Sequence, residues 1–241
     1  MLLALDTSTR AVGLALYDGA QVLSEAVWTS HDHHTVELAP AVAEMLEKCG
    51  AKVQDLEALA VALGPGSFTG LRIGLALAKG IALVRRIPII GIPTLDILAA
   101  AQPVSEQWGL AAVLRAGRGR LATGWYQAGS ASSASQPDGK GSHGTKGALS
   151  WQPSGKIEVF TPDDLLQHIQ TPTLVCGELT EDERHLLGRK RKNVILASPA
   201  HSLRRPGFLA EIGWQRWQQG YADDPAVLSP IYLHYNEPIP G

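Results

Sequence analysis

The segment GPGSFTGLRIG, at residues 64–74, is the stretch that decides the fold. Three of its glycines fall within seven residues, between an apolar segment at 59–63 and an apolar helical segment at 70–84. Glycine tolerates positive φ and lets a ligand or another part of the chain approach the backbone closely. The stretch lacks the Lys-Ser/Thr pair of a Walker A loop. Two interpretations stay open: a tight strand-to-helix turn, or an anion site at a helix N-terminus.

The neighbouring segments alternate between strand and helix patterns. The predicted elements, in chain order, are strands at 2–5, 12–17 and 22–28, a helix at 35–49, a strand at 59–63, a helix at 70–84, a strand at 87–92 and a helix at 94–101. The three opening strands read as a meander, with a short Asp-Gly turn between the second and the third. This β-β-β-α-β-α-β-α order predicts an α/β fold with helices packed on a mixed sheet.

The pattern weakens after residue 102, so we divide the chain into an N-terminal lobe at 1–102 and a C-terminal lobe at 103–241. Residues 129–155 are dominated by Gly, Ser, Ala and Lys and predict a low-complexity surface insertion or long hairpin loop. The other elements expected in this lobe are strands at 110–114, 121–126, 173–176 and 194–197, helices at 161–170 and 206–220, and an extended piece at 231–235. The pattern also allows the last helix, at 206–220, to pack on the first lobe.

Composition excludes several classes of protein. The 241 residues carry 21 Lys and Arg against 23 Asp and Glu, a net charge of −2, so a strongly basic nucleic-acid binder is not the default. The two cysteines, Cys49 and Cys176, lie too far apart for a CxxC site. The sequence shows neither a signal-peptide pattern nor a long apolar run, which predicts a cytoplasmic protein without a membrane segment.

Two polar segments offer candidate chemistry. Asp6, Thr7 and Ser8 follow the first strand, and an acid with neighbouring hydroxyls can hold a metal–phosphate pair. They are weak cofactor-binding candidates, because a polar turn that caps its own backbone has the same composition. The run His31–His34 suggests a metal, but closely spaced ligands in one loop converge poorly without others, and we predict no metal site.

Four strings together resemble the TsaB family, also called YeaZ. They are LALDTST at 3–9, the segment at 64–74, Ala78-Lys79-Gly80, and Pro230–Leu233. The most specific motif residues are Gly64, Pro65, Gly66, Ser67, Phe68, Thr69, Gly70 and Arg72. The resemblance is close over roughly the first 100 residues and looser beyond them. It implies the actin-like ATPase fold, which is ribonuclease H-like and has two related lobes, each with a mixed sheet flanked by helices.

The resemblance implies a role in making threonylcarbamoyladenosine (t6A) in tRNA. Family members are regarded as non-catalytic subunits that bind a TsaD-type transferase, which modifies adenosine 37 of ANN-decoding tRNAs. A TsaE-type ATPase completes the complex. The implied properties of this chain are a homodimer in isolation, tRNA contact only within the complex, and no catalytic residue. No cofactor is expected for the chain alone, since ATP and a metal are used by the partner complex.

The resemblance places partner binding on two helices of the first lobe. The helix at 70–84 is apolar on nearly every side, and such a helix must be covered on every side. The expected partner contacts are Leu38, Val42, Met45, Gly70, Leu71, Gly74, Leu77, Ala78 and Ile81. Among these, Gly70, Gly74 and Ala78 have four-residue spacing and would form a groove for a partner helix.

Departures from enzyme patterns weigh against two alternatives, an ATP-dependent small-molecule kinase and a metallopeptidase-like enzyme. TsaD-type enzymes carry a His-x-x-x-His metal pair where Thr94 and Leu98 stand here. The glycine-rich adenosine loop of ATP-using relatives is matched only by Val175–Glu178, with one glycine. Arg115 also stands where the TsaB pattern has an acid.

Overall fold

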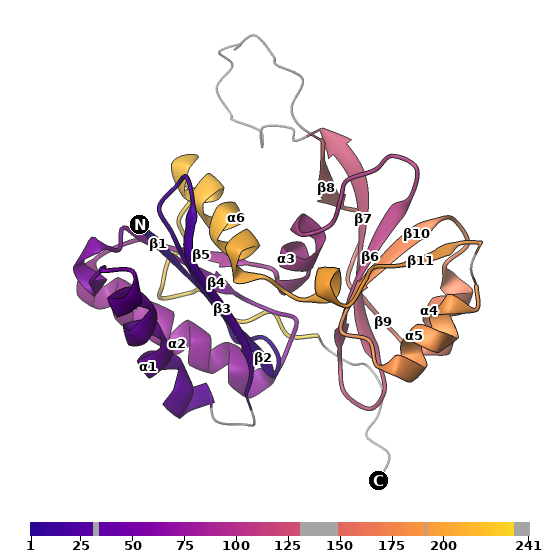
Figure 1. Cartoon of the computed structure of the whole chain (residues 1–241), viewed down its shortest axis with the longest axis horizontal. Helices are drawn as coiled ribbons and strands as arrows, with labels where there is room; N and C mark the ends of the chain where they lie inside the picture. The colour runs from indigo at the N-terminus through magenta and orange to yellow at the C-terminus, as the bar shows by residue number, and fades with distance from the viewer. Residues whose placement is uncertain (31–33, 131–148, 191, 234–241) are drawn as a thin grey trace. The chain divides into compact units, whose positions relative to one another are not determined.

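The computed structural model describes residues 1–30, 34–130, 149–190 and 192–233 (Figure 1). It divides into two compact units, one formed by Met1–Ile97 with the segment from Arg204 onward, the other by Leu98–Leu203. The predicted boundary after residue 102 moves to Ile97, and the last helix, which the sequence analysis allowed to return to the first lobe, belongs to the first unit.

The first unit is built on a five-stranded sheet with the order β3-β2-β1-β4-β5. The strands are β1 (Leu2–Asp6), β2 (Ala11–Tyr17), β3 (Val22–Thr29), β4 (Ala58–Ala62) and β5 (Ile89–Ile92). The pairs β1–β2 and β2–β3 are antiparallel, whereas β1–β4 and β4–β5 are parallel. The sheet is mixed, as the order of predicted elements indicated.

Helices cover both faces of this sheet, which explains why β1 and β4 are continuous apolar runs. Helices α1 (His34–Lys48) and α2 (Phe68–Arg85) lie on one face, where Leu3 and Leu5 join the core. Helix α6 (Pro206–Gln218) lies on the other face, against Leu2 and Ala4. The remaining elements of this region are the 3-10 turn η1 (Val53–Asp55) and helix α3 (Thr94–Ala100).

The second unit repeats the same sheet plan, with the order β11-β10-β6-β7-β8. Its strands are β6 (Gly109–Arg115), β7 (Leu121–Ser130), β8 (Leu149–Pro153), β9 (Glu158–Phe160), β10 (Thr173–Gly177) and β11 (Val194–Leu196), with β9 paired to β7. Strands β6, β10 and β11 are parallel, and β7 runs antiparallel to β6 and β8. Helices α4 (Pro162–His168) and α5 (Glu181–Gly188) pack on one face, and η2 (Ala200–Ser202) precedes the return to the first unit.

The predicted insertion at 129–155 is wrong at both ends. Residues up to Ser130 extend β7, and Leu149–Pro153 forms β8 beside it. Trp151 is buried and donates its indole N–H to the Gln102 carbonyl at 3.3 Å. The small polar residues of the segment mask the strand signal of these few positions; residues 131–148 lie outside the described residues. Strand β9 and helix α5 were also not predicted, and the part of 231–235 that is described, Ile231–Leu233, is not a strand.

Candidate functional site: a closed polar turn and an outward helix face

The polar turn after β1 holds Asp6, whose carboxylate is engaged inside the chain. Its Oδ1 accepts a hydrogen bond from the Ser8 backbone N–H at 2.9 Å. Its Oδ2 accepts from Arg204 Nε at 2.7 Å, and both side chains are only 2% exposed. The Arg204 guanidinium also donates to Thr9 Oγ1 at 2.7 Å and to the Ala11 carbonyl at 3.0 Å. Asp6 therefore has a buried counter-cation supplied by its own chain.

The two hydroxyls of the turn are engaged in the same way. Thr7 Oγ1 donates to the Gly70 carbonyl at 2.7 Å, and Ser8 Oγ lies 2.7 Å from Thr94 Oγ1, with which it shares a hydrogen bond. Thr94 Oγ1 also accepts from the Gly64 N–H at 2.9 Å. The structure thus brings the three weak cofactor-binding candidates together and directs their polar groups at α2, α3 and Arg204.

Three glycines at the start of α2 let the helix approach this turn. A Cβ added to Gly66 would lie 2.2 Å from the Ser8 carbonyl oxygen. A Cβ added to Gly70 or Gly74 would lie 2.3 or 2.2 Å from an oxygen of Thr7. No side chain fits at such distances. Of the two interpretations of the glycine-rich segment, the structure supports the tight strand-to-helix turn.

The predicted partner face is largely internal. Leu77 and Ile81 are half-buried against the core, and the other predicted contacts are buried: Leu38, Val42, Met45, Gly70, Leu71, Gly74 and Ala78. Gly70 and Gly74 pack on the chain's own β1 turn and Ala78 lies in the core, so none of the three small residues faces outward in the described chain. The partner itself stays a prediction.

A different row of α2 faces outward. Phe68, Arg72, Ala76, Gly80 and Leu83 are all exposed and follow one another at three- to four-residue spacing, so they share one side of the helix. We call them the outer stripe. A Cβ at Gly80 would meet nothing within 4 Å, so the fold of this chain does not require glycine there.

The outer stripe ends in unusually exposed apolar side chains. Leu83 and its neighbour Val84 are 79% and 82% exposed, more than any other large apolar side chain that the structure describes. Val36 on the adjacent helix α1 is 66% exposed. Leu83 and Val84 adjoin each other, whereas Val36 lies in the first turn of its helix; adjoining exposed apolar side chains are typical of a protein–protein interface.

In the second unit, Arg115 has a structural role. Its Nη1 lies 3.2 Å from Glu183 Oε2, and Glu183 is nearly buried. Glu183 also closes the N-terminus of α5 by accepting from the Thr180 N–H at 2.7 Å. Arginine at the position where the TsaB pattern has an acid is therefore matched by a carboxylate on α5.

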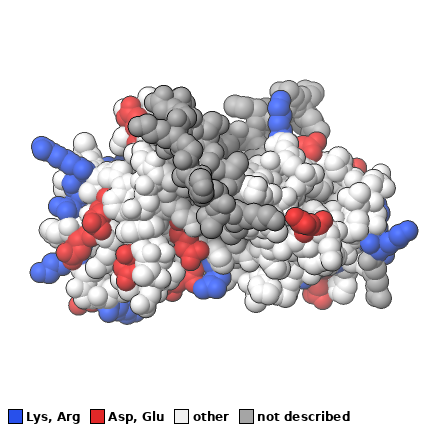
Figure 2. All heavy atoms as spheres, turned by 90° about the horizontal axis from the view of Figure 1, so that it is seen from above, with Lys and Arg blue, Asp and Glu red and all other residues white. Residues whose placement is uncertain are grey.

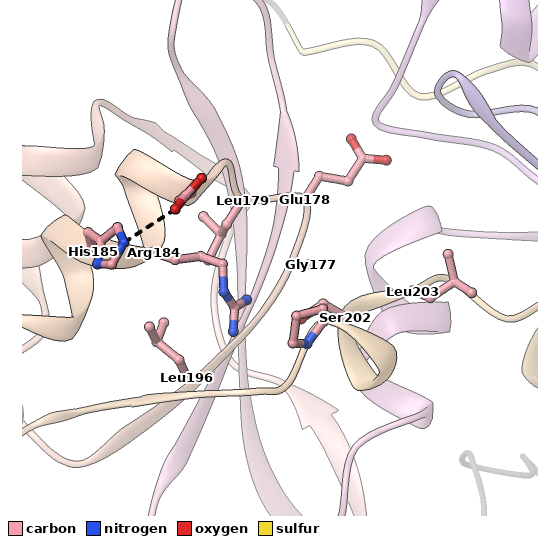
Figure 3. A pocket seen from close by; sticks show the side chains of 10 residues that line it. Gly177, Glu178, Leu179, Arg184, His185, Leu196, Ser202 and Leu203 are labelled. Carbon is pink, nitrogen blue, oxygen red and sulfur yellow. Dashed lines mark ion pairs between the residues drawn. The ribbon is translucent and has the colours of Figure 1, made fainter. Parts of the chain in front are cut away.

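A cavity of about 560 Å³ opens at the carboxyl ends of β10 and β11 (Figure 3). Leu179 and Leu196 form apolar walls, and Arg184 reaches in from α5 while donating to the Ala197 carbonyl at 2.7 Å. Ser202 Oγ is buried and has no hydrogen-bond partner among the described residues. Besides Arg184 and Ser202, the polar lining consists of Glu178, Glu181 and His185, and the lining has no run of glycines to cradle phosphates.

The single glycine of the predicted adenosine loop is required by the sheet. Gly177 has φ +122°, and a Cβ there would lie 2.0 Å from the Val113 carbonyl oxygen on β6. Cys176 before it is fully buried, and burial raises the pKa of its thiol to about 12, so the thiol stays protonated at neutral pH. This segment is a tightly packed strand end.

The positions of the transferase metal pair are also internal. Thr94 bonds to Ser8 and Gly64 as described, and Leu98 is fully buried. Within the described residues, no group of three or more His, Cys, Asp and Glu side chains could hold a metal ion; His31, Asp32 and His33 lie outside them. None of the described helices is long and apolar enough to cross a bilayer.

Comparison with known proteins identifies the family. The family model described as "TsaD: tRNA N6-adenosine threonylcarbamoyltransferase" matches residues 21–137. The Bacillus subtilis (strain 168) tRNA threonylcarbamoyladenosine biosynthesis protein TsaB is 39% identical over 98% of this chain and 95% of its own length. The chain belongs to the TsaB family. The Escherichia coli (strain K12) TsaB is 40% identical over a segment covering 41% of this chain and 42% of that protein.

Solved structures agree on the fold of this TsaB-family chain. YeaZ from Pseudomonas aeruginosa is 24% identical, covers 96% of this chain and 99% of its own, and superposes with a TM-score of 0.70. A second Pseudomonas aeruginosa structure, described as a protein with similarity to peptidase YeaZ, superposes with a TM-score of 0.72. It is 23% identical and covers 97% of this chain and 99% of its own. The two-lobed actin-like ATPase fold is therefore confirmed. One relative named tRNA N6-adenosine threonylcarbamoyltransferase, from Granulibacter bethesdensis, is 32% identical over 46% of this chain and 34% of its own length.

Two site residues had no role in the sequence analysis. Arg204 pairs with an acid 198 positions away, and no local pattern marks that pairing. Tyr232 belongs to the Pro230–Leu233 string that carries part of the family resemblance, but only the structure shows that it contacts α2.

Replacing each of two glycines of α2 by alanine should change the stability of the chain in opposite directions. We expect Gly70→Ala to lower the free energy of unfolding by about 2 kcal/mol, because the added methyl meets the Thr7 carbonyl. Gly80→Ala should raise it by about 0.5–1 kcal/mol, because alanine favours the helix and the site is open. Urea denaturation of the two variants checks the prediction. Equal effects at the two positions would contradict the packing role of the motif.

The buried ion pair should be strongly coupled. Arg204→Gln leaves the Asp6 carboxylate buried without its cation and should cost about 3–5 kcal/mol of unfolding free energy. The double variant with Asp6→Asn removes both charges and should cost much less than the sum of the single changes. A double-mutant cycle by denaturation measures the coupling, and additive costs would show that the pair contributes nothing as a pair.

Proposed function

We propose that this chain is a non-catalytic subunit of tRNA t6A biosynthesis that acts by binding a TsaD-type transferase. Its family membership supports the pathway, since the Bacillus subtilis relative is named for t6A biosynthesis and is similar over nearly the whole chain. The observation that carries the binding role is the outer stripe of α2, which is apolar at Leu83 and small at Ala76 and Gly80.

The polar turn supports a role without catalysis. A phosphate or metal at the end of β1 would need Asp6, Thr7 or Ser8 as ligands, and these groups already bond to the chain. We therefore propose that the chain alone binds no nucleotide and has no transferase, kinase or peptidase activity. Thr94 and Leu98 weigh against the activity named for the transferase relative, because neither can replace an imidazole ligand.

The net charge of −2 does not favour a chain that binds tRNA by itself. On the face shown in Figure 2, acidic and basic residues of the described chain are interspersed, and neither sign forms a continuous patch there. The proposed tRNA contact is accordingly made within the complex. A homodimer through the outer stripe, and a TsaE-type ATPase as third component, are further parts of the proposal.

The test places charge on the outer stripe. Ala76→Glu and Gly80→Glu put a carboxylate at exposed helix positions where the fold has room, so the variants should fold with unchanged circular dichroism. We expect each to weaken binding to the transferase homologue of the same organism by about tenfold or more, because the charge is desolvated at the interface. Calorimetric titration of the purified proteins gives the affinities.

Gln167→Glu is the matched control, because it adds the same charge at an exposed position on α4 of the second unit. It should bind like the wild-type chain. Absence of wild-type binding, or stripe variants that bind as tightly as the control, would overturn the proposed function.

A further inference from the structure

The first turns of α2 carry an exposed arginine that stacks on one aromatic ring and is hydrogen-bonded to a second aromatic side chain. The Arg72 guanidinium carbon lies 3.6 Å from the centroid of the Phe68 ring, and the Phe68 and Tyr232 rings lie 5.1 Å apart. Arg72 Nε donates to Tyr232 Oη at 2.9 Å. The stacking and the hydrogen bond together fix the orientation of the guanidinium plane. The guanidinium of an exposed arginine ordinarily has no fixed orientation.

The fixed plane leaves the terminal nitrogens available. Within the described residues, the only hydrogen bond of Arg72 is the one from Nε, so Nη1 and Nη2 have no partner. Two parallel N–H groups from a planar guanidinium match the two oxygens of a carboxylate. Phe68 beside it is 55% exposed, which leaves an apolar surface next to the donors.

The charge around Arg72 favours an anion. The first turn of α2 has no acidic residue to offset the positive end of the helix dipole, and no Asp or Glu occurs anywhere in Phe68–Arg85. Arg85, at the C-terminal end of α2, donates hydrogen bonds to the Val53 and Gln54 carbonyls. Arg72 is therefore the cation of the outer stripe itself; Lys79 of the same helix is half-buried, and Arg86 follows the end of the helix.

Tyr232 is held in place by the end of the chain. The Ile231 N–H donates to the Leu63 carbonyl at 2.7 Å, and Ile231 and Leu228 pack against the core on the side of α2. The segment 228–233 is therefore fixed to the carboxyl end of β4 and positions the tyrosine hydroxyl. A residue 160 positions from Arg72 sets the orientation of its guanidinium.

We propose that Arg72, stacked on Phe68, anchors a carboxylate side chain of the partner protein, and that Tyr232 is the positioning residue for this anchor. The inference rests on the proposed function and adds the chemistry of the contact. The occupant is an apolar helix of the partner with an acidic residue at one end. An RNA phosphate suits the guanidinium equally well, but RNA would leave the adjoining apolar row of Ala76, Gly80 and Leu83 uncovered.

The experiment measures the affinity for the same transferase homologue at low and moderate salt. Arg72→Ala should weaken binding by about tenfold and reduce its salt dependence, because the arginine contact and its ion pair are lost. Arg72→Lys should recover only part of the affinity, since lysine cannot form two parallel hydrogen bonds. Tyr232→Phe keeps the ring and removes the acceptor, so it should weaken binding by a smaller factor without changing the thermal midpoint.

Lys192→Ala is the control for loss of one exposed cation, on the second unit. If Ala76→Glu abolishes binding while Arg72→Ala matches Lys192→Ala, the anchor is wrong and the proposed function stands. If the wild-type chain does not bind, both fail. If Arg72→Ala leaves transferase binding intact but removes binding of tRNA by the isolated chain, the anion is a phosphate and the carboxylate assignment is overturned. If it weakens only self-association, the occupant is a second copy, which also contradicts the proposal.

Discussion

The turn after β1 is the constraint on which the first unit depends. Its carboxylate, hydroxyls and carbonyls bond to α2, to the start of α3 and to Arg204, which are separated by long stretches of sequence. Because Gly66, Gly70 and Gly74 have no side chains, α2 can lie against this turn. Thr94 lies just before the chain leaves the first unit, and Arg204 lies just after it returns. This one turn thus holds α2 and both places where the chain passes between the two units.

The same closure is consistent with the binding role that we propose for this fold. A strand-end acid with adjacent hydroxyls has the composition of a phosphate or metal site, but here Arg204 supplies the positive charge and the helix and turn backbone supply the hydrogen-bond partners. What remains exposed is the opposite side of α2, with an arginine and an aromatic ring at one end and aliphatic side chains at the other. Packing and the proposed partner binding use opposite sides of one helix.

The sequence predicted the first sheet and its helices well, because each has a clear period or an uninterrupted apolar run. It could not predict which side of α2 faces outward, because a helix that is apolar on nearly every side carries no pattern to orient it. Gly70 and Gly74 were assigned to a partner although they pack against Thr7. β8 was missed because Leu149 and Trp151 sit in a stretch of Gly and Ser. The Asp6–Arg204 pair could not be predicted, since nothing local links the two residues.

Hydrogen exchange by mass spectrometry, on the chain alone and with the transferase homologue, tests the central claim most directly. The account predicts slower exchange in α1, α2 and the segment 228–233 on binding, with no change at the turn of Asp6–Thr9, which is already closed, or around the cavity near Gly177 and Ser202. Protection that appears at the turn or the cavity while α2 stays unchanged would contradict it.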